Sequence, residues 1–147
     1  MALRARTRNL RSRASDVAAS GPRPSTLARW GLGAMLVAAG VHKLLDPAAW
    51  TVYVTDWLAP WLVVSPTLFM LVNGYLEVLF GAALLADRYV AFAAFVAAVS
   101  LAVTTGYLAI VWLGTGAFGD VLARDVGLTG LAWAVLADAL GERTRSD

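Results

Sequence analysis

The chain has 147 residues, of which 59% are hydrophobic, and its mean hydropathy is +0.67. Soluble domains contain about 45 to 50% apolar residues, so this composition indicates an integral membrane protein of one domain rather than a soluble protein. Cysteine is absent, which excludes disulfides, thiol redox pairs and iron–sulfur ligands. The pI is near 9.4, but most of the charge flanks apolar segments, so we expect no nucleic-acid partner.

The first 25 residues carry half of the basic side chains, together with Ser, Gly and Pro and few large apolar residues. We expect residues 1–25 to form a disordered basic cytoplasmic tail that rests on anionic headgroups. An Arg- and Ser-rich, acid-poor leader also resembles an organellar transit peptide. We favour the cytoplasmic tail over this cleaved leader, because the apolar run that would follow a secretory signal begins late and is long.

Four stretches are apolar enough to cross a bilayer, which takes about 20 residues each. They run from Leu27 to Leu45, Pro66 to Ala86, Tyr89 to Leu113 and Val121 to Leu140. The sequence therefore predicts an all-α, four-helix transmembrane bundle over residues 26–141, with a cytoplasmic tail over residues 142–147. The fourth stretch is the least apolar of them, because it holds Arg124, Asp125 and Asp138.

The segment between the first two spans is aromatic and too short to cross. Its Trp50, Tyr53, Trp57 and Trp61 recur at spacings of three and four residues, which predicts a short amphipathic helix with the rings on one side. Because Trp and Tyr favour the headgroup level, this helix is expected to lie along the interface and cap the bundle.

Basic residues predict the orientation. With the amino terminus inside, ten of the twelve basic residues fall on the inner side, and only Lys43 and Arg124 fall on the outer side. This asymmetry follows the positive-inside rule and places both termini in the cytoplasm of a multi-pass cell-membrane protein.

Ionisable residues in the predicted spans define the candidate site. Glu77 lies about 16 Å into the second span, near the bilayer midplane, where an ionised group must face the bundle interior and be paired, or be protonated. The cations within reach are Lys43 and Arg124, and Asp125 follows Arg124 at the outer end of the fourth span. We predict catalytic roles for Glu77, Lys43, Arg124 and Asp125.

Polar residues at helical spacing extend this site. Asn73 lies one turn before Glu77, and His42 and Tyr107 lie on the faces expected to turn inward from the first and third spans, so we predict cofactor-binding roles for these three residues. Two alternatives remain open at this point. A buried ion pair can serve only to fix helix register, and a histidine at a helix end can be simply interfacial.

No cofactor motif is visible in the sequence. One histidine is too few for a bis-histidine haem, no set of residues has metal-ligand spacing, and no glycine-rich loop follows a strand. We therefore expect no haem, metal or flavin site. A redox role would depend on a lipid-soluble quinone from the bilayer.

Two segments carry a family resemblance. "RWGLGAMLVAAGVHKLLDPAAW" and "NGYLEVLFGAALLADRYVAFAAFVAA" resemble the DoxX-like family of small four-helix membrane proteins, over roughly Ala28 to Leu140. The resemblance implies a likeness to the membrane subunit of thiosulfate:quinone oxidoreductase, or to membrane-associated assemblies of redox defence. By this resemblance Lys43, Glu77 and Arg88 occupy recurring charged positions, whereas His42 and residues 123–127 have no clear counterpart.

The leading hypothesis is a quinone-linked oxidoreductase subunit that works with a redox partner subunit in the lipid bilayer. Lys43, Arg124 or His42 would donate to a quinone oxygen, and Glu77 or Asp125 would handle protons. An anionic donor such as thiosulfate is disfavoured by the nearby carboxylates of Asp46, Asp120 and Asp125. The alternative is a non-catalytic anchor or stabilising subunit, and a small transporter ranks below both because no inverted repeat is visible. Whether the chain is an enzyme stays open.

Overall fold

The computed structural model describes residues 21–146, and the regular secondary structure in this range is entirely helical. Its elements are α2 (Pro24–Leu45), α3 (Ala48–Thr51), the 3₁₀ turn η1 (Ala59–Trp61), α4 (Pro66–Leu85), α5 (Val90–Thr115) and α6 (Gly119–Ser146). The all-α prediction with four long helices is confirmed, and each long helix overlaps its predicted stretch. The tail predicted over residues 1–25 lies almost wholly outside the described residues.

Local residue chemistry sets several helix ends. Pro24 and Pro66 stand at the first position of α2 and α4, where a missing N–H costs nothing and the fixed φ suits the helix. The Ser65 side chain caps α4 by accepting a hydrogen bond from the Leu68 N–H at 3.3 Å. Gly116 ends α5 with φ +74°, a left-handed conformation that glycine adopts without strain.

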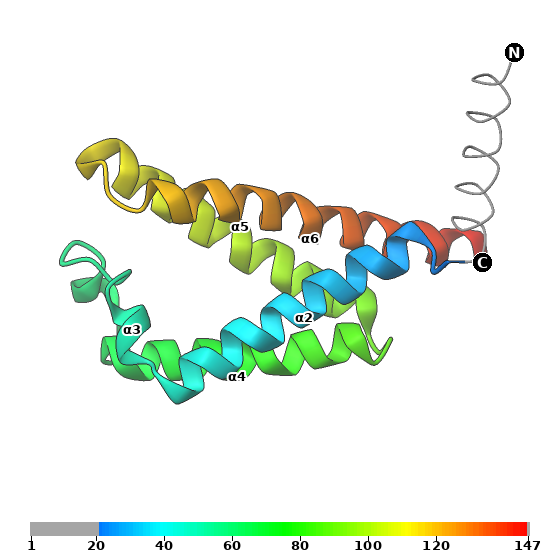
Figure 1. The fold of residues 1–147 in the computed structure, drawn as a ribbon, viewed down its shortest axis with the longest axis horizontal. Helices are drawn as coiled ribbons and strands as arrows, with labels where there is room; N and C mark the ends of the chain where they lie inside the picture. Colours follow the sequence, from blue (N-terminus) through cyan, green and yellow to red (C-terminus); the bar gives the residue numbers. More distant parts are fainter. Residues whose placement is uncertain (1–20, 147) are drawn as a thin grey trace, which may run out of the picture.

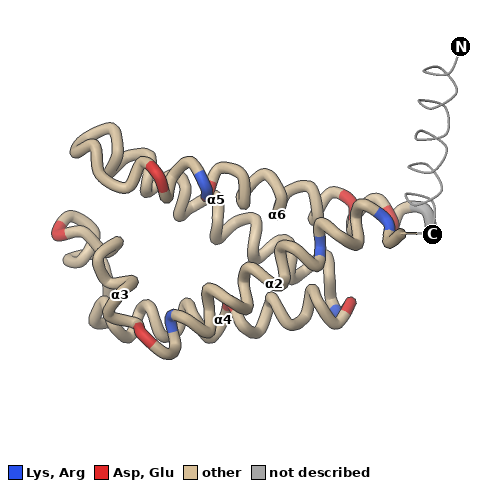
Figure 2. The backbone as a smooth tube through the Cα atoms, in the orientation of Figure 1, with Lys and Arg blue, Asp and Glu red and all other residues tan. Residues whose placement is uncertain are grey.

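Two of the long helices are long and apolar enough to cross a membrane by length and composition alone, namely α4 and α5. The charged residues of α2 and α6 lie toward the helix ends, α5 carries none, and α4 carries only Glu77 (Figure 2). This distribution suits helices whose ends lie near water and whose middles lie in hydrocarbon.

The long helices form two antiparallel pairs, one of α2 with α4 and one of α5 with α6. The pairs lie close together at the end where α2 begins and α6 ends, and they spread apart toward the segment that carries α3 (Figure 1). A hydrogen bond of 2.8 Å between the Thr105 and Thr129 hydroxyls links α5 to α6. The neighbouring Thr104 lines the space between the pairs.

Glycines bring α2 and α4 into backbone contact at two places. A Cβ atom built on Gly40 would lie 2.5 Å from the Gly74 carbonyl oxygen, and one built on Gly81 would lie 2.8 Å from the Gly33 carbonyl oxygen. No side chain larger than hydrogen fits at such distances. Small residues of this kind allow close helix packing in membranes, where the hydrophobic effect does not drive helices together.

The core lies at the end where the two pairs converge. Leu32, Leu84, Ala94, Ala98 and Ala132 are completely buried there. The alanines of α5 let the neighbouring helices approach closely. Beyond this core the two pairs separate, so the opposite half of the bundle is less tightly filled.

The segment between α2 and α4 differs from the single amphipathic helix that the aromatic spacing predicted. Helix α3 is one turn long, and residues 52–58 form turns before η1. A continuing helix would need the Thr55 N–H for its own ladder, but this N–H donates to the Tyr107 hydroxyl at 3.3 Å. The rings therefore diverge: Trp50 and Tyr53 line the space between the helix pairs, whereas Trp61 is 78% exposed.

The glycine contacts predict a strong effect of one added methyl group. Gly40→Ala would push the α2 backbone away from α4 and should lower the free energy of unfolding by about 1–3 kcal/mol, the usual cost of overpacking. The matched control is Gly106→Ala in α5, where an added Cβ meets nothing within 4 Å. Thermal unfolding of the detergent-solubilised variants measures both effects, and equal midpoints for the two variants would contradict the contact.

Candidate functional site

Lys43 forms the centre of the polar cluster on the α2–α4 pair. Its side chain is buried, and the Nζ atom donates to Asn73 Oδ1 at 2.7 Å and to Glu77 Oε1 at 2.6 Å. The Trp50 ring covers the same ammonium, with its centroid 4.5 Å from Nζ. An ammonium group carries three N–H donors, and the bonds to Asn73 and Glu77 use two of them.

Lys43 reaches α4 because the two helices lie so close. A Cβ built on Gly74 would lie 2.8 Å from Lys43 Cβ, so the lysine stem lies directly on the α4 backbone at this glycine. Asn73 and Glu77 are one turn apart and share a face of α4. The ammonium therefore meets both side chains at once, as the sequence predicted for Lys43 and Glu77.

Glu77 has one satisfied and one unsatisfied carboxyl oxygen. Oε1 accepts from Lys43, whereas Oε2 is buried and has no hydrogen-bond partner in the described part of the chain. A buried acceptor left without a donor costs about 1–3 kcal/mol. This atom is enclosed by the protein, so a ligand or a water molecule would reach it only after neighbouring side chains shift.

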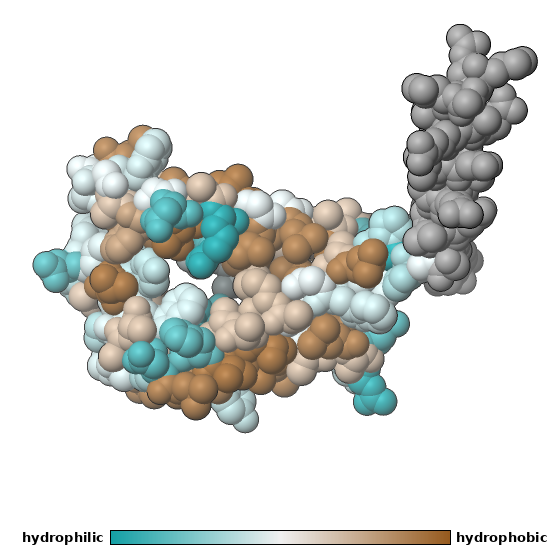
Figure 3. Space-filling view, viewed as in Figure 1, coloured by the Kyte–Doolittle hydropathy of each residue, from teal (hydrophilic) through white to brown (hydrophobic). Residues whose placement is uncertain are grey.

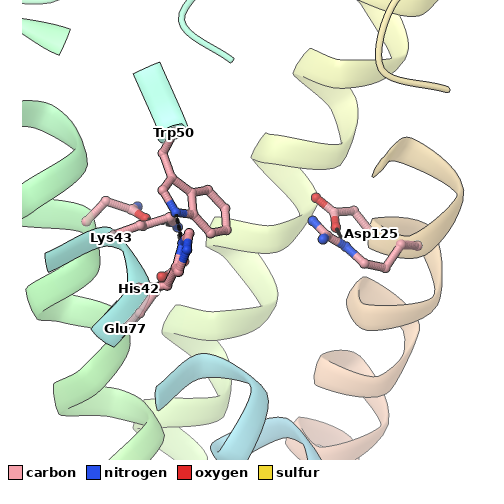
Figure 4. Close-up of polar contacts among 7 residues, drawn as sticks. His42, Lys43, Trp50, Glu77 and Asp125 are labelled. Atoms are coloured by element: carbon pink, nitrogen blue, oxygen red, sulfur yellow. Dashed lines mark hydrogen bonds and ion pairs between the residues drawn. The ribbon is translucent and has the colours of Figure 1, made fainter. Parts of the chain in front are cut away.

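Arg124 and Asp125 form a second ion pair on α6. Arg124 Nε lies 2.9 Å from Asp125 Oδ1, and the Asp125 side chain is buried while that of Arg124 is 56% exposed. The Asp125 side chain faces the Lys43 cluster from the opposite wall (Figure 4). The sequence offered Arg124 as an alternative partner of Glu77, and the structure instead gives each carboxylate its own cation.

A cavity of about 690 Å³ lies between these two ion pairs. Figure 3 shows it as a hollow between the helix pairs, with hydrophilic atoms at its rims. Its remaining wall is mostly apolar and includes Met35, Leu36, Phe69, Met70, Phe80 and Leu108. Its volume falls in the range of about 300–1,000 Å³ that is usual for small-molecule sites.

His42 does not line this cavity. The side chain is exposed, and Nδ1 accepts a hydrogen bond of 2.7 Å from Trp50 Nε1 (Figure 4). His42 therefore holds the indole that covers Lys43, and its cofactor-binding role stays a prediction. Trp50 is the site residue that sequence reasoning missed, because its spacing with the other aromatic residues indicated only an interfacial anchor.

Tyr107 does reach the cavity, but its hydroxyl is occupied. The hydroxyl donates to the Tyr53 carbonyl at 2.7 Å and contacts the Thr55 hydroxyl at 2.9 Å. The Tyr107 ring also stacks on Trp57, with 5.9 Å between centroids. Tyr107 thus ties the outer segment to α5 and is part of the cavity wall.

Within residues 21–146, no group of three or more His, Asp or Glu side chains is placed to hold a metal ion. The side chains that line the cavity include carboxylates, an ammonium, a guanidinium and aromatic rings.

The model of the DoxX family matches residues 25–113, which is more than half of the chain. The chain belongs to the DoxX family. It is a DoxX membrane protein, and the matched region contains Lys43, Asn73, Glu77 and Tyr107, whereas Arg124 and Asp125 lie beyond it. Neither a curated protein nor a solved structure matches the chain.

The Lys43–Glu77 pair of this DoxX protein should be strongly coupled. Lys43→Met leaves the Glu77 charge without a cation, and Glu77→Leu leaves the ammonium without an anion, so each single change should cost about 3–5 kcal/mol. The double variant removes both charges and should recover much of that loss. Thermal unfolding of the two single variants and the double variant gives the coupling free energy between Lys43 and Glu77.

The control for this cycle is Arg88→Met, which removes an exposed cation from the α4–α5 turn and should leave stability nearly unchanged. If the losses of unfolding free energy caused by Lys43→Met and Glu77→Leu simply add in the double variant, the two side chains do not stabilise each other.

Proposed function

We propose that this DoxX protein is the membrane subunit of a quinone-linked oxidoreductase, and that the quinone ring binds in the cavity between the two helix pairs. The observation that carries the proposal is a cavity of about 690 Å³ whose mostly apolar wall also carries the Lys43–Glu77 and Arg124–Asp125 ion pairs. An apolar pocket with a few convergent polar groups is the usual form of a ligand site. A quinone has polar oxygens on its ring and an apolar tail. The oxygens suit the polar groups of this cavity, and the tail suits its apolar wall.

The residues present fit such a ligand. The quinone/quinol couple supplies the exchange of electrons and protons, with the electrons coming from or going to a redox partner subunit. Glu77 or Asp125 would take up and release the protons of the couple, and Lys43 holds the Glu77 carboxyl in place through Oε1. Apolar side chains around the cavity exclude water from the ring.

A second function is favoured by a different observation. Lys43, Asn73 and Glu77 bond directly to one another across α2 and α4, which is the arrangement expected of a pair that holds helices in register. Under this alternative the protein is a non-catalytic anchor or stabilising subunit of a membrane complex. If this alternative is right, a larger side chain in the cavity has no effect on quinone binding.

Filling the cavity separates the two functions. Ser100 is exposed and lines the cavity, while its neighbour Val99 is 40% exposed and does not line it. Ser100→Phe should therefore lower the affinity for a decyl-substituted 1,4-benzoquinone at least about tenfold, since the new ring takes the ligand's place. Val99→Phe, which adds the same ring toward lipid, should leave the affinity unchanged.

Calorimetric titration of the purified protein in detergent measures the binding. If the unaltered protein does not bind the benzoquinone or the corresponding quinol, or if the two phenylalanine variants behave alike, the cavity is not a quinone site and the anchor function stands.

The positive-inside pattern supports the proposal that both termini lie in the cytoplasm and that the α3 segment lies outside. The chain has no cysteine, so single cysteines report their own side of the membrane. Val63→Cys, at a fully exposed position of the outer segment, should react with a membrane-impermeant maleimide in intact cells. Ala86→Cys, in the turn between α4 and α5, should react only after cell lysis, and the reverse pattern would invert the orientation.

A further inference from the structure

A seam between α4 and α5 runs along one side of the cavity. On α4, Leu76 and Phe80 are one turn apart, and on α5, Phe92 and Val103 are eleven residues apart, which is about three turns. The two residues of each helix therefore lie on the same side of it. Because the Phe80 and Phe92 rings meet edge to face, with 5.9 Å between centroids, these sides face each other. We call these four residues the α4–α5 seam.

The α4–α5 seam is closed at one level and open at another. The Phe80–Phe92 contact closes it toward the end where the helix pairs converge. Toward the end where the pairs spread, Leu76 and Val103 both line the cavity, and they are 43% and 68% exposed. Phe92 is 60% exposed without lining the cavity, so this side of α5 faces outward, and Val103 shares it. The cavity therefore reaches the outer surface of the bundle between Leu76 and Val103.

This opening lies at the depth of the bilayer hydrocarbon. Leu76 stands about 15 Å along α4 from Pro66, near the middle of a helix that is long and apolar enough to cross a membrane. The hydrocarbon core is about 30 Å thick. A molecule in the opening between Leu76 and Val103 therefore meets lipid chains rather than headgroups or water.

The α4–α5 seam is also the side of the cavity that is free of exposed charge. Helix α5 contains no charged residue. Glu77 is the only charged residue of α4, and it is paired with Lys43 of α2. Helix α6 instead contributes Arg124, whose side chain is 56% exposed, to the cavity wall. An apolar chain that passed beside Arg124 would remove water from a charged group, which is unfavourable.

We propose that the opening between Leu76 and Val103 is a lateral portal through which the cavity ligand enters from the bilayer and through which its apolar chain extends back into lipid. The inference rests on the proposed function and adds the chemical class of the ligand, a ring that carries a long apolar chain. The ring lies between the two ion pairs, and the chain leaves between α4 and α5. Leu76 and Val103 are then residues that recognise the chain and do not touch the ring.

Photolabelling of the unaltered full-length protein in detergent locates the chain. The probe is a decyl-substituted 1,4-benzoquinone with a diazirine on the third carbon of its chain, and only labelling that excess unmodified decyl-benzoquinone removes is counted. Trypsin cuts after Arg29, Lys43, Arg88 and Arg124, so α2, α4, α5 and α6 are recovered on separate peptides. The competed label should lie near Leu76 on peptide 44–88 and near Val103 on peptide 89–124.

Label on peptides 30–43 and 125–143 instead would show that the chain leaves between α2 and α6, which overturns the portal while the proposed function survives. If excess decyl-benzoquinone removes no label from any peptide, the quinone does not bind in the cavity and the proposed function itself is overturned. Both outcomes are read on the unaltered protein and do not depend on the folding of a variant.

A blocking variant tests the portal by affinity. The two ligands are tetramethyl-1,4-benzoquinone and the same ring with a decyl chain in place of one methyl group. Leu76→Trp should lower the affinity for the decyl ligand about tenfold, because the larger ring takes the place of the chain, and should leave the affinity for the tetramethyl ligand unchanged. Val103→Trp, on the other side of the portal, should have the same effect.

The matched control is Leu79→Trp, the same change on α4 at a 54% exposed position that does not line the cavity. It should leave the affinities for both ligands unchanged. In calorimetric titrations, an unchanged decyl affinity in Leu76→Trp and Val103→Trp, or an equal loss for both ligands, overturns the portal. Failure of both ligands to bind the unaltered protein overturns the proposed function.

Discussion

The backbone contact between α2 and α4 is the constraint on which the rest of the molecule depends. Gly33 meets Gly81 and Gly40 meets Gly74, two helical turns apart on each helix, so the pair is held at both points along its length. This closeness places Lys43 against α4 and gives its buried ammonium two oxygen partners. With a wider separation Lys43 would extend to the headgroup level, as long basic side chains do at helix ends, and Glu77 would lose its cation.

The same constraint explains why a cavity exists beside a tightly packed interface. Because α2 and α4 are bound to each other by backbone contact, they do not also close on α5 and α6 along their whole length. The two pairs meet at the alanine-rich core around Ala94 and Ala98 and diverge beyond it. The segment after α2 lies at the open end, where Tyr107 fixes it through the backbone of Tyr53 and Thr55. The α2–α4 backbone contact therefore accounts both for the close pair and for the open space between the two helix pairs.

The sequence predicted the long helices because apolar runs bounded by proline, glycine and charges report directly on helix existence and ends. It also predicted that Lys43 and Glu77 meet, since both lie in the same half of the bundle and neither charge is stable alone in hydrocarbon. The partner of Arg124 could not be predicted, because it depends on how α6 is rotated about its axis. The aromatic segment was misread for a related reason: spacing reports local helix propensity, whereas the Tyr107 hydroxyl on another helix takes the backbone N–H that a helix would need.

Charge balance in the cavity also bears on the kind of molecule it suits. Lys43 is neutralised by Glu77 and Arg124 by Asp125, so each wall presents an ion pair with no net charge. An anion such as thiosulfate would add an uncompensated negative charge beside these neutral pairs, which is costly away from water. A neutral ring with polar oxygens leaves both pairs intact and uses only their spare hydrogen-bonding positions. Under the proposed function, the fixed pairs would orient an uncharged, lipid-soluble ligand by its polarity rather than by its charge.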